Sequence, residues 1–165
     1  MHRYQTWNGP MPTSAAQQAV TTGTSIKTML QLGVPSTRQI QLLAWGFTID
    51  ATEAGTVELI QSDTAATVTA HVAAGVQPLT PGQPASMLTL STTATGYTSS
   101  SETAPVTTRV FDVHKIQAAD GATITELEKI WVPDARPIVA VSTFVRVRAT
   151  FSTAVNMTCW VCWDE

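Results

Sequence analysis

Two cysteines near the C-terminus are the first candidates for chemistry, because Cys159 and Cys162 have the C-x-x-C spacing of redox and zinc sites. A zinc site needs four ligands, and the sequence offers neither a second cysteine pair nor a nearby histidine. A redox pair normally opens a helix, whereas residues 155–163 have the pattern of a strand. Positions three apart on a strand point to opposite faces, so we predict two reduced, packed thiols and no metal.

The histidines His2, His71 and His114 lie far apart and form no metal-binding or catalytic motif. Asp112 and His114 share one strand face and could orient a base, but no serine stands in a nucleophile elbow. We expect a solvated or interface pair there. A metal site built from His71 and His114 on neighbouring strands is the lesser alternative. With no glycine-rich phosphate loop in the sequence, we expect neither an enzyme nor a cofactor.

Charged and aromatic residues near the C-terminus are candidates for contact with a partner. Arg146 and Arg148 point outward from an alternating strand and could hold carboxylates of a partner subunit. Pairing within the sheet with Glu126 or Glu128, which share a strand face, is slightly favoured over that. Trp160 points away from its apolar neighbours in the last strand, as an exposed aromatic anchor at an interface would.

The composition excludes several classes of protein. The 165 residues form one domain of ordinary size, with a net charge of −3. This charge disfavours nucleic-acid binding and docking to anionic membranes, and no apolar run is long enough for a membrane span. Only 13% of the residues are charged, while 28 threonines supply much of the polarity. Threonine suits strand surfaces, and a surface poor in charge is typical of interface cores. Without an apolar signal segment at the start, we expect a chain made and kept in the cytosol, or a viral chain assembled there.

Two regions show no clear periodic pattern of apolar and polar residues. Residues 1–35 are interrupted by proline and glycine, and we predict an extended N-terminal arm there, tacked down by one short strand or turn. Tyr4, Trp7 and Met11 lie near the tip of this arm and would contact a partner. Residues 73–108 are predicted to form a long loop region that is a second candidate docking surface.

Residues 36–165 are predicted to form the folded domain. Alternating segments indicate about eight strands, with almost no helical period. These segments are residues 39–50, 56–62, 67–72, 107–116, 127–132, 138–141, 143–151 and 155–163. We therefore predict an all-β fold, a two-sheet antiparallel sandwich that is jelly-roll-like. An immunoglobulin-like sandwich is the alternative.

A resemblance to a known family covers most of the chain through short segments in a characteristic order. These are residues 19–31 (AVTTGTSIKTMLQ), 44–47 (AWGF), 57–63 (VELIQSD), 65–70 (AATVTA), 94–98 (ATGYT), 144–148 (FVRVR) and the tryptophan-bearing last strand. Together they resemble small virion proteins of tailed bacteriophages, especially those that infect actinobacteria. The resemblance implies capsid decoration, with a trimer seated on the major capsid protein at the virion surface. It implies no catalytic residue.

The resemblance and the residue patterns together give one set of candidate capsid contacts. They are Tyr4, Trp7, Met11, Arg146, Arg148 and Trp160. Two other functions stay open. One is a different virion part, such as a head fibre or tail protein, and the other is a carbohydrate-binding module, because sandwiches with exposed tryptophans often stack on sugars.

Overall fold

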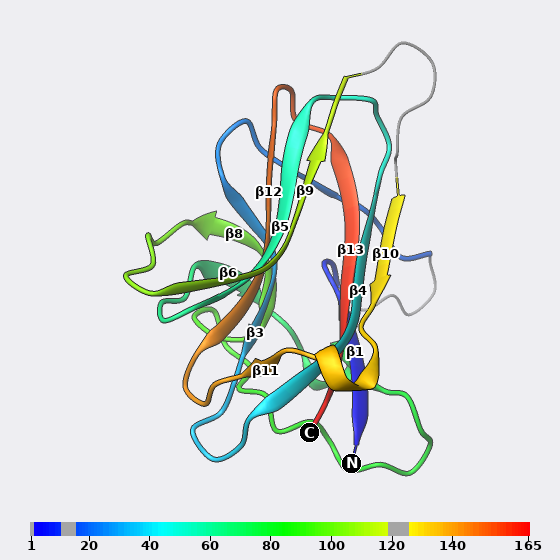
Figure 1. The fold of residues 1–165 in the computed structure, drawn as a ribbon, viewed down its shortest axis with the longest axis vertical. Coiled ribbons are helices and arrows are strands. Elements are labelled where there is room, and N and C mark those ends of the chain that lie inside the picture. The colour runs from blue at the N-terminus through cyan, green and yellow to red at the C-terminus, as the bar shows by residue number, and fades with distance from the viewer. Residues whose placement is uncertain (1, 11–15, 119–125) are drawn as a thin grey trace.

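A computed structural model describes residues 2–10, 16–118 and 126–165 and has two β-sheets packed face to face (Figure 1). Sheet A has seven strands in the order β10-β4-β13-β1-β7, with β11 paired to β4 and β2 paired to β13. Sheet B has six strands in the order β6-β8-β3-β12-β5-β9. Every strand pair is antiparallel, so the predicted all-β, two-sheet antiparallel sandwich is confirmed.

The elements have the following bounds. Sheet A consists of β1 (Arg3–Trp7), β2 (Val20–Thr21), β4 (Ile40–Ile49), β7 (Val76–Pro78), β10 (Glu126–Ile130), β11 (Ile138–Val139) and β13 (Asn156–Asp164). Sheet B consists of β3 (Lys27–Gly33), β5 (Gly55–Ser62), β6 (Thr67–Ala70), β8 (Gly96–Ser101), β9 (Thr108–Ile116) and β12 (Phe144–Phe151). Two short 3-10 turns, η1 (Ala73–Gly75) and η2 (Pro133–Ala135), join strands.

The core lies between the sheets and is built by alternate residues of their strands. In β12, the predicted inward positions Val145, Val147 and Phe151 are each at most 2% exposed. Trp45 of β4 and Trp163 of β13 are the largest side chains that are fully buried. Strand alternation therefore delivers one apolar face of each sheet to the core, as the period of two requires.

All eight segments predicted as strands contain strands in the structure. The five additional strands β1, β2, β3, β7 and β8 all fall in residues 1–35 and 73–108, where the sequence predicted few. Each of these additional strands pairs with strands that are distant in sequence, such as β13 or β12. Their local sequence is short, polar or continuously apolar, so alternation alone does not mark them.

The prediction of an extended arm over residues 1–35 is wrong, because two strands of this region, β1 and β3, lie inside the sheets. β1 lies between β13 and β7 in sheet A, and β3 lies between β8 and β12 in sheet B. Tyr4 is 1% exposed and stacks on Trp163, with 5.9 Å between ring centroids. Tyr4 is therefore a core residue and no capsid contact, because burial against Trp163 removes it from the surface. Met11 lies outside the described residues.

The long loop predicted over residues 73–108 is corrected in part, because β8 is an internal strand of sheet B between β6 and β3. Only isolated bridges at Thr89 and Leu90 occur between β7 and β8. At the two ends of the chain, His2 and Glu165 exchange backbone hydrogen bonds of 3.2 and 3.0 Å, so the ends lie together (Figure 1). Among the described residues, no helix has the length and apolar character needed to cross a membrane.

Candidate functional site

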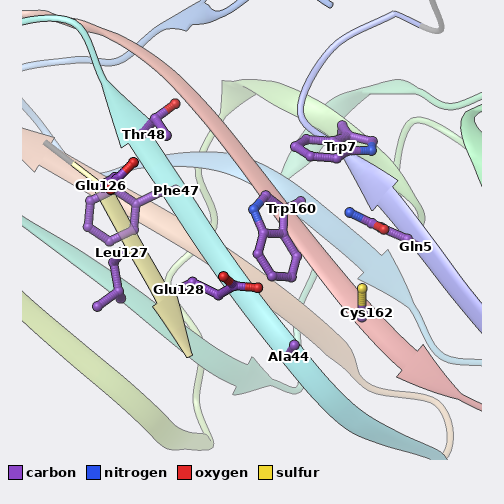
Figure 2. Close-up of a pocket in the computed structure, with 10 residues that line it drawn as sticks. All are labelled: Gln5, Trp7, Ala44, Phe47, Thr48, Glu126, Leu127, Glu128, Trp160 and Cys162. Carbon is purple, nitrogen blue, oxygen red and sulfur yellow. The ribbon is translucent and has the colours of Figure 1, made fainter. Parts of the chain in front are cut away.

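A groove of about 730 Å³ lies on the outer face of sheet A, the face turned away from the core (Figure 2). Strands β1, β4, β10 and β13 supply its lining, which consists of Gln5, Trp7, Ala44, Phe47, Thr48, Glu126, Leu127, Glu128, Trp160 and Cys162. Strand register forms its centre, because Trp7 pairs with Trp160, Trp160 with Gly46, and Gly46 with Glu128. These four residues make one row across four neighbouring strands.

Gly46 allows the Trp160 ring to lie directly on the sheet. A β-carbon at position 46 would stand 2.8 Å from Cζ2 of Trp160 and 2.5 Å from the Leu127 carbonyl oxygen, both closer than atoms can pack. The Trp7 ring lies beside Trp160, with centroids 6.1 Å apart and planes tilted by 51°. Both tryptophans are half-buried, so they present ring surface to the groove.

The polar side chains of the groove are open to a ligand. In the described part of the chain, the side chains of Gln5, Thr48, Glu126 and Glu128 have no hydrogen-bond partner, and neither do the indole nitrogens of the two groove tryptophans. The tryptophans of the core differ, since Trp45 donates to Asp112 at 3.0 Å and Trp163 donates to Glu165 at 2.9 Å. Figure 2 shows Trp160 in the centre, with Gln5 toward β1 and Glu128 toward β10.

His71 holds the end of β1 from the inner side. Its Nε2 lies 2.8 Å from the Trp7 carbonyl oxygen and 3.2 Å from Oγ1 of Thr6. The Trp7 carbonyl can only accept, so Nε2 carries the proton and donates to it. Burial lowers the pKa of His71, while the bond to Trp7 opposes this shift. A neutral His71 therefore fixes the backbone from which Trp7 projects.

The two cysteines are free and lie on opposite sheet faces, as predicted. Cys159 is 0% exposed in the core, and burial raises the pKa of its thiol well above the ordinary value. Cys162 lines the groove, and burial together with the Glu128 carboxylate raises its thiol pKa to about 11. Both groups are thiols rather than thiolates near neutral pH, which makes them poor nucleophiles and poor metal ligands.

The two arginines proposed as capsid contacts pair inside the protein. Arg146 is 0% exposed, and its guanidinium pairs with Glu102 and donates to Thr28 Oγ1 at 2.9 Å. Arg148 pairs with Glu58 of the neighbouring strand. Pairing within the protein is thus the correct alternative, but the partners Glu126 and Glu128 were wrong, because these lie in sheet A and the arginines lie in sheet B.

Asp112 and His114 belong to a cluster that joins the two sheets, rather than to a solvated pair. Asp112 accepts hydrogen bonds from Trp45 Nε1 at 3.0 Å and His114 Nε2 at 3.1 Å, and it forms an ion pair with Lys129 at 3.1 Å. Burial raises the pKa of Asp112, but these hydrogen bonds outweigh it and the net shift is downward. The metal alternative fails, because His71 follows β6 and His114 lies in β9, at opposite edges of sheet B.

A second surface lies where β9, the edge of sheet B, meets β10 and β11 of sheet A, and we call it the β9–β10 margin. The Asp112–Lys129 ion pair and a 3.0 Å bond from Arg109 to the Ile138 carbonyl hold these strands together. Seven of the twelve exposed large apolar side chains of the described residues lie in this part of the chain. They are Val106, Val110, Val113, Ile130, Val132, Ile138 and Val141. Exposed apolar edges are rare unless a partner covers them.

Sequence reasoning singled out Trp7 and Trp160, and the structure brings them together. It missed Gln5, Gly46 and Thr48, although alternation with the buried Tyr4 and Phe47 could have assigned them to an outer face. No group of three or more His, Cys, Asp or Glu residues is arranged for a metal within the described ranges. No protein family, curated protein or solved structure matches the chain.

Proposed function

We propose that this chain is a non-enzymatic structural virion protein, which decorates a phage capsid by binding major capsid protein subunits. The β9–β10 margin is the observation that carries the proposal. It presents Val110 at 56% and Ile130 at 69% exposure on two edge strands, and burying such side chains against a partner is favourable. The order of the segments that resemble tailed-phage virion proteins supports a capsid as that partner.

Residues 73–108 supply a second contact surface in this proposal. Leu79, Met87 and Leu90 are exposed there, on the stretch between β7 and β8. The contacts are thus assigned to exposed apolar side chains of the sandwich instead of an arm. A trimer seated on the capsid surface, assembled in the host cytoplasm, would present several copies of the margin at once, and multivalency would strengthen a weak single contact.

Co-sedimentation with capsids tests the proposal. The full chain is mixed with capsids assembled from the major capsid protein alone, and we expect saturable binding. Val110→Lys combined with Ile130→Lys should lower the affinity at least about tenfold, since it places charge in an apolar contact. Ile26→Lys is the matched control, because Ile26 is also half exposed but lies away from the margin.

Binding to purified tails or head fibres, with none to capsids, would assign the protein to another part of the virion. Binding to neither particle would contradict the structural role. Light scattering of the purified protein measures the trimer separately, so a monomer would correct only that part of the proposal.

A further inference from the structure

We propose that the groove on sheet A binds a non-acidic oligosaccharide, with Trp160 and Trp7 as stacking surfaces for its sugar rings. This function goes beyond capsid docking and uses different residues from the β9–β10 margin, although Ile130 of the margin borders the groove on the same face of β10. A protein that occupied a capsid through its margin could present the groove to a glycan outside the particle.

The aromatic row gives the site its shape. Sugar rings have C–H faces that pack on indole, and Trp160 lies flat on Gly46 with Trp7 beside it at 6.1 Å. The row from Trp7 to Glu128 crosses four strands, which at about 4.8 Å per strand spans roughly 14 Å. A groove of this length and of about 730 Å³ suits a short oligosaccharide better than a single sugar.

The polar groups favour a ligand with many hydroxyls. Gln5 and the two indole N–H groups can donate hydrogen bonds, and Glu126, Glu128 and Thr48 can accept them. Gln5 lies toward β1, whereas the three acceptors lie toward β4 and β10 (Figure 2). None of these side-chain groups has a hydrogen-bond partner within the described chain. A proline-rich peptide would also stack on tryptophan, but it has few groups to satisfy this many donors and acceptors.

The charge of the groove selects against acidic sugars. Glu126 and Glu128 line it, and no lysine or arginine is among the lining residues. A uronic or sialic acid would place its carboxylate beside like charges, whereas neutral hydroxyls can donate to them. Both carboxylates come from β10, so they lie on one side of the groove. Hydrolysis by a glycosidase would need carboxyl groups on both sides of the bond, so the geometry points to binding alone.

Titration calorimetry with the full chain tests the proposal. The neutral or amino-sugar probes are cellohexaose, maltohexaose and chitosan hexamer, and the acidic probe is a hexamer of galacturonic acid. We expect at least one non-acidic probe to bind and the acidic probe to bind at least about tenfold more weakly. Trp160→Ala and Trp7→Ala should each reduce the affinity at least about tenfold, as loss of a central aromatic anchor does.

Ile130→Ala is the matched control, because Ile130 is exposed on β10 but does not line the groove. Trp160→Phe is a second variant in case Trp160→Ala does not fold. It keeps a smaller aromatic ring and should bind sugar with intermediate affinity. The proposal fails if no non-acidic probe binds, if the acidic probe binds best, or if both alanine variants bind normally. It also fails if those variants lose capsid binding instead. The Val110→Lys and Ile130→Lys variant should keep its sugar affinity, which separates this site from the docking proposal.

Discussion

Sheet A and sheet B each turn one face away from the core, and both outer faces carry long polar or aromatic side chains near their centres. On sheet A these side chains line the open groove around Trp160. On sheet B the corresponding centre holds Arg146, which is fully buried and paired with Glu102. The same outward orientation on a strand therefore leads to an open site on one sheet and to a buried, paired arginine on the other.

The connection between β8 and β9 causes this difference. β8 and β9 are separated in sheet B by β3, β12 and β5, so the chain must cross roughly 19 Å at about 4.8 Å per strand. Through residues 102–107 the chain makes seven Cα steps from Ser101 to Thr108, which reach about 23–25 Å when extended, so the connection has little slack. This segment runs over Arg146, whose Nη1 donates to the Thr103 carbonyl at 3.2 Å, and it ends on Asp63, which accepts from the Val106 and Thr107 amides (Figure 1).

Arg146→Ala gives the largest effect that follows from the comparison. The substitution removes a fully buried guanidinium and leaves Glu102, whose side chain is 26% exposed, without its cation. The variant should therefore lose about 3 kcal/mol of unfolding free energy, the lower end of the cost of breaking a buried pair. Urea denaturation followed by circular dichroism measures the loss. Arg3→Ala, at an exposed position of sheet A, is the control and should change stability by less than about 0.5 kcal/mol. A loss below about 1 kcal/mol for Arg146→Ala would mean that the covered face behaves like open surface.

Strand alternation explains how much could be predicted from the sequence. It located eight strands and the inward face of β12, because one buried face is enough to set a period of two. It also assigned Arg146 to an outer face, and that orientation is correct. The alternation pattern does not predict that residues 102–107 cover the outer face of sheet B, because a connection between strands has no hydrophobic period of its own.

Strand alternation also could not predict how the residues of the candidate site come together. Trp7 and Trp160 were chosen one by one as exposed aromatics, and their pairing depends on the register of β1 with β13, some 150 residues apart. Tyr4 was grouped with Trp7 because both lie near the start of the chain, yet an odd separation of three along β1 turns them to opposite faces. A strand assignment for residues 3–7 would have separated the two.

Acid should weaken the sandwich through His71, on the side of sheet A. Burial lowers the pKa of His71 in the folded protein, and unfolding restores it to about 6.5, so the unfolded chain binds the extra proton. The contribution of His71 is therefore complete above that pH and declines as the pH falls from about 6.5 toward the folded pKa. We expect urea stability to fall over this range by less than the Arg146→Ala loss. His71→Gln, which can still donate to the Trp7 carbonyl, should show a smaller pH slope, while His2→Gln keeps the original slope.

Glu128→Gln should have the smallest effect on stability. It contrasts an open carboxylate of sheet A with Glu102, the partner of the buried arginine of sheet B. Glu128 has no ion pair within the described residues and faces the open groove, so losing its charge should change the unfolding free energy by less than about 0.5 kcal/mol. The matched change Glu102→Gln removes the partner of a buried arginine and should cost about 1–3 kcal/mol.

The alkylation rate of Cys162 tests whether the Glu128 carboxylate acts on the groove even though it adds little stability. Burial and then Glu128 raise the pKa of the Cys162 thiol to about 11, so removing the charge lowers that pKa and increases the thiolate fraction at pH 9. Iodoacetamide should then alkylate Cys162 faster in Glu128→Gln than in the unmodified protein, with Cys159 unreacted in both because it lies in the core. Equal alkylation rates would mean that Glu128 points away from the groove, and the acidic side of the proposed sugar site would then be lost.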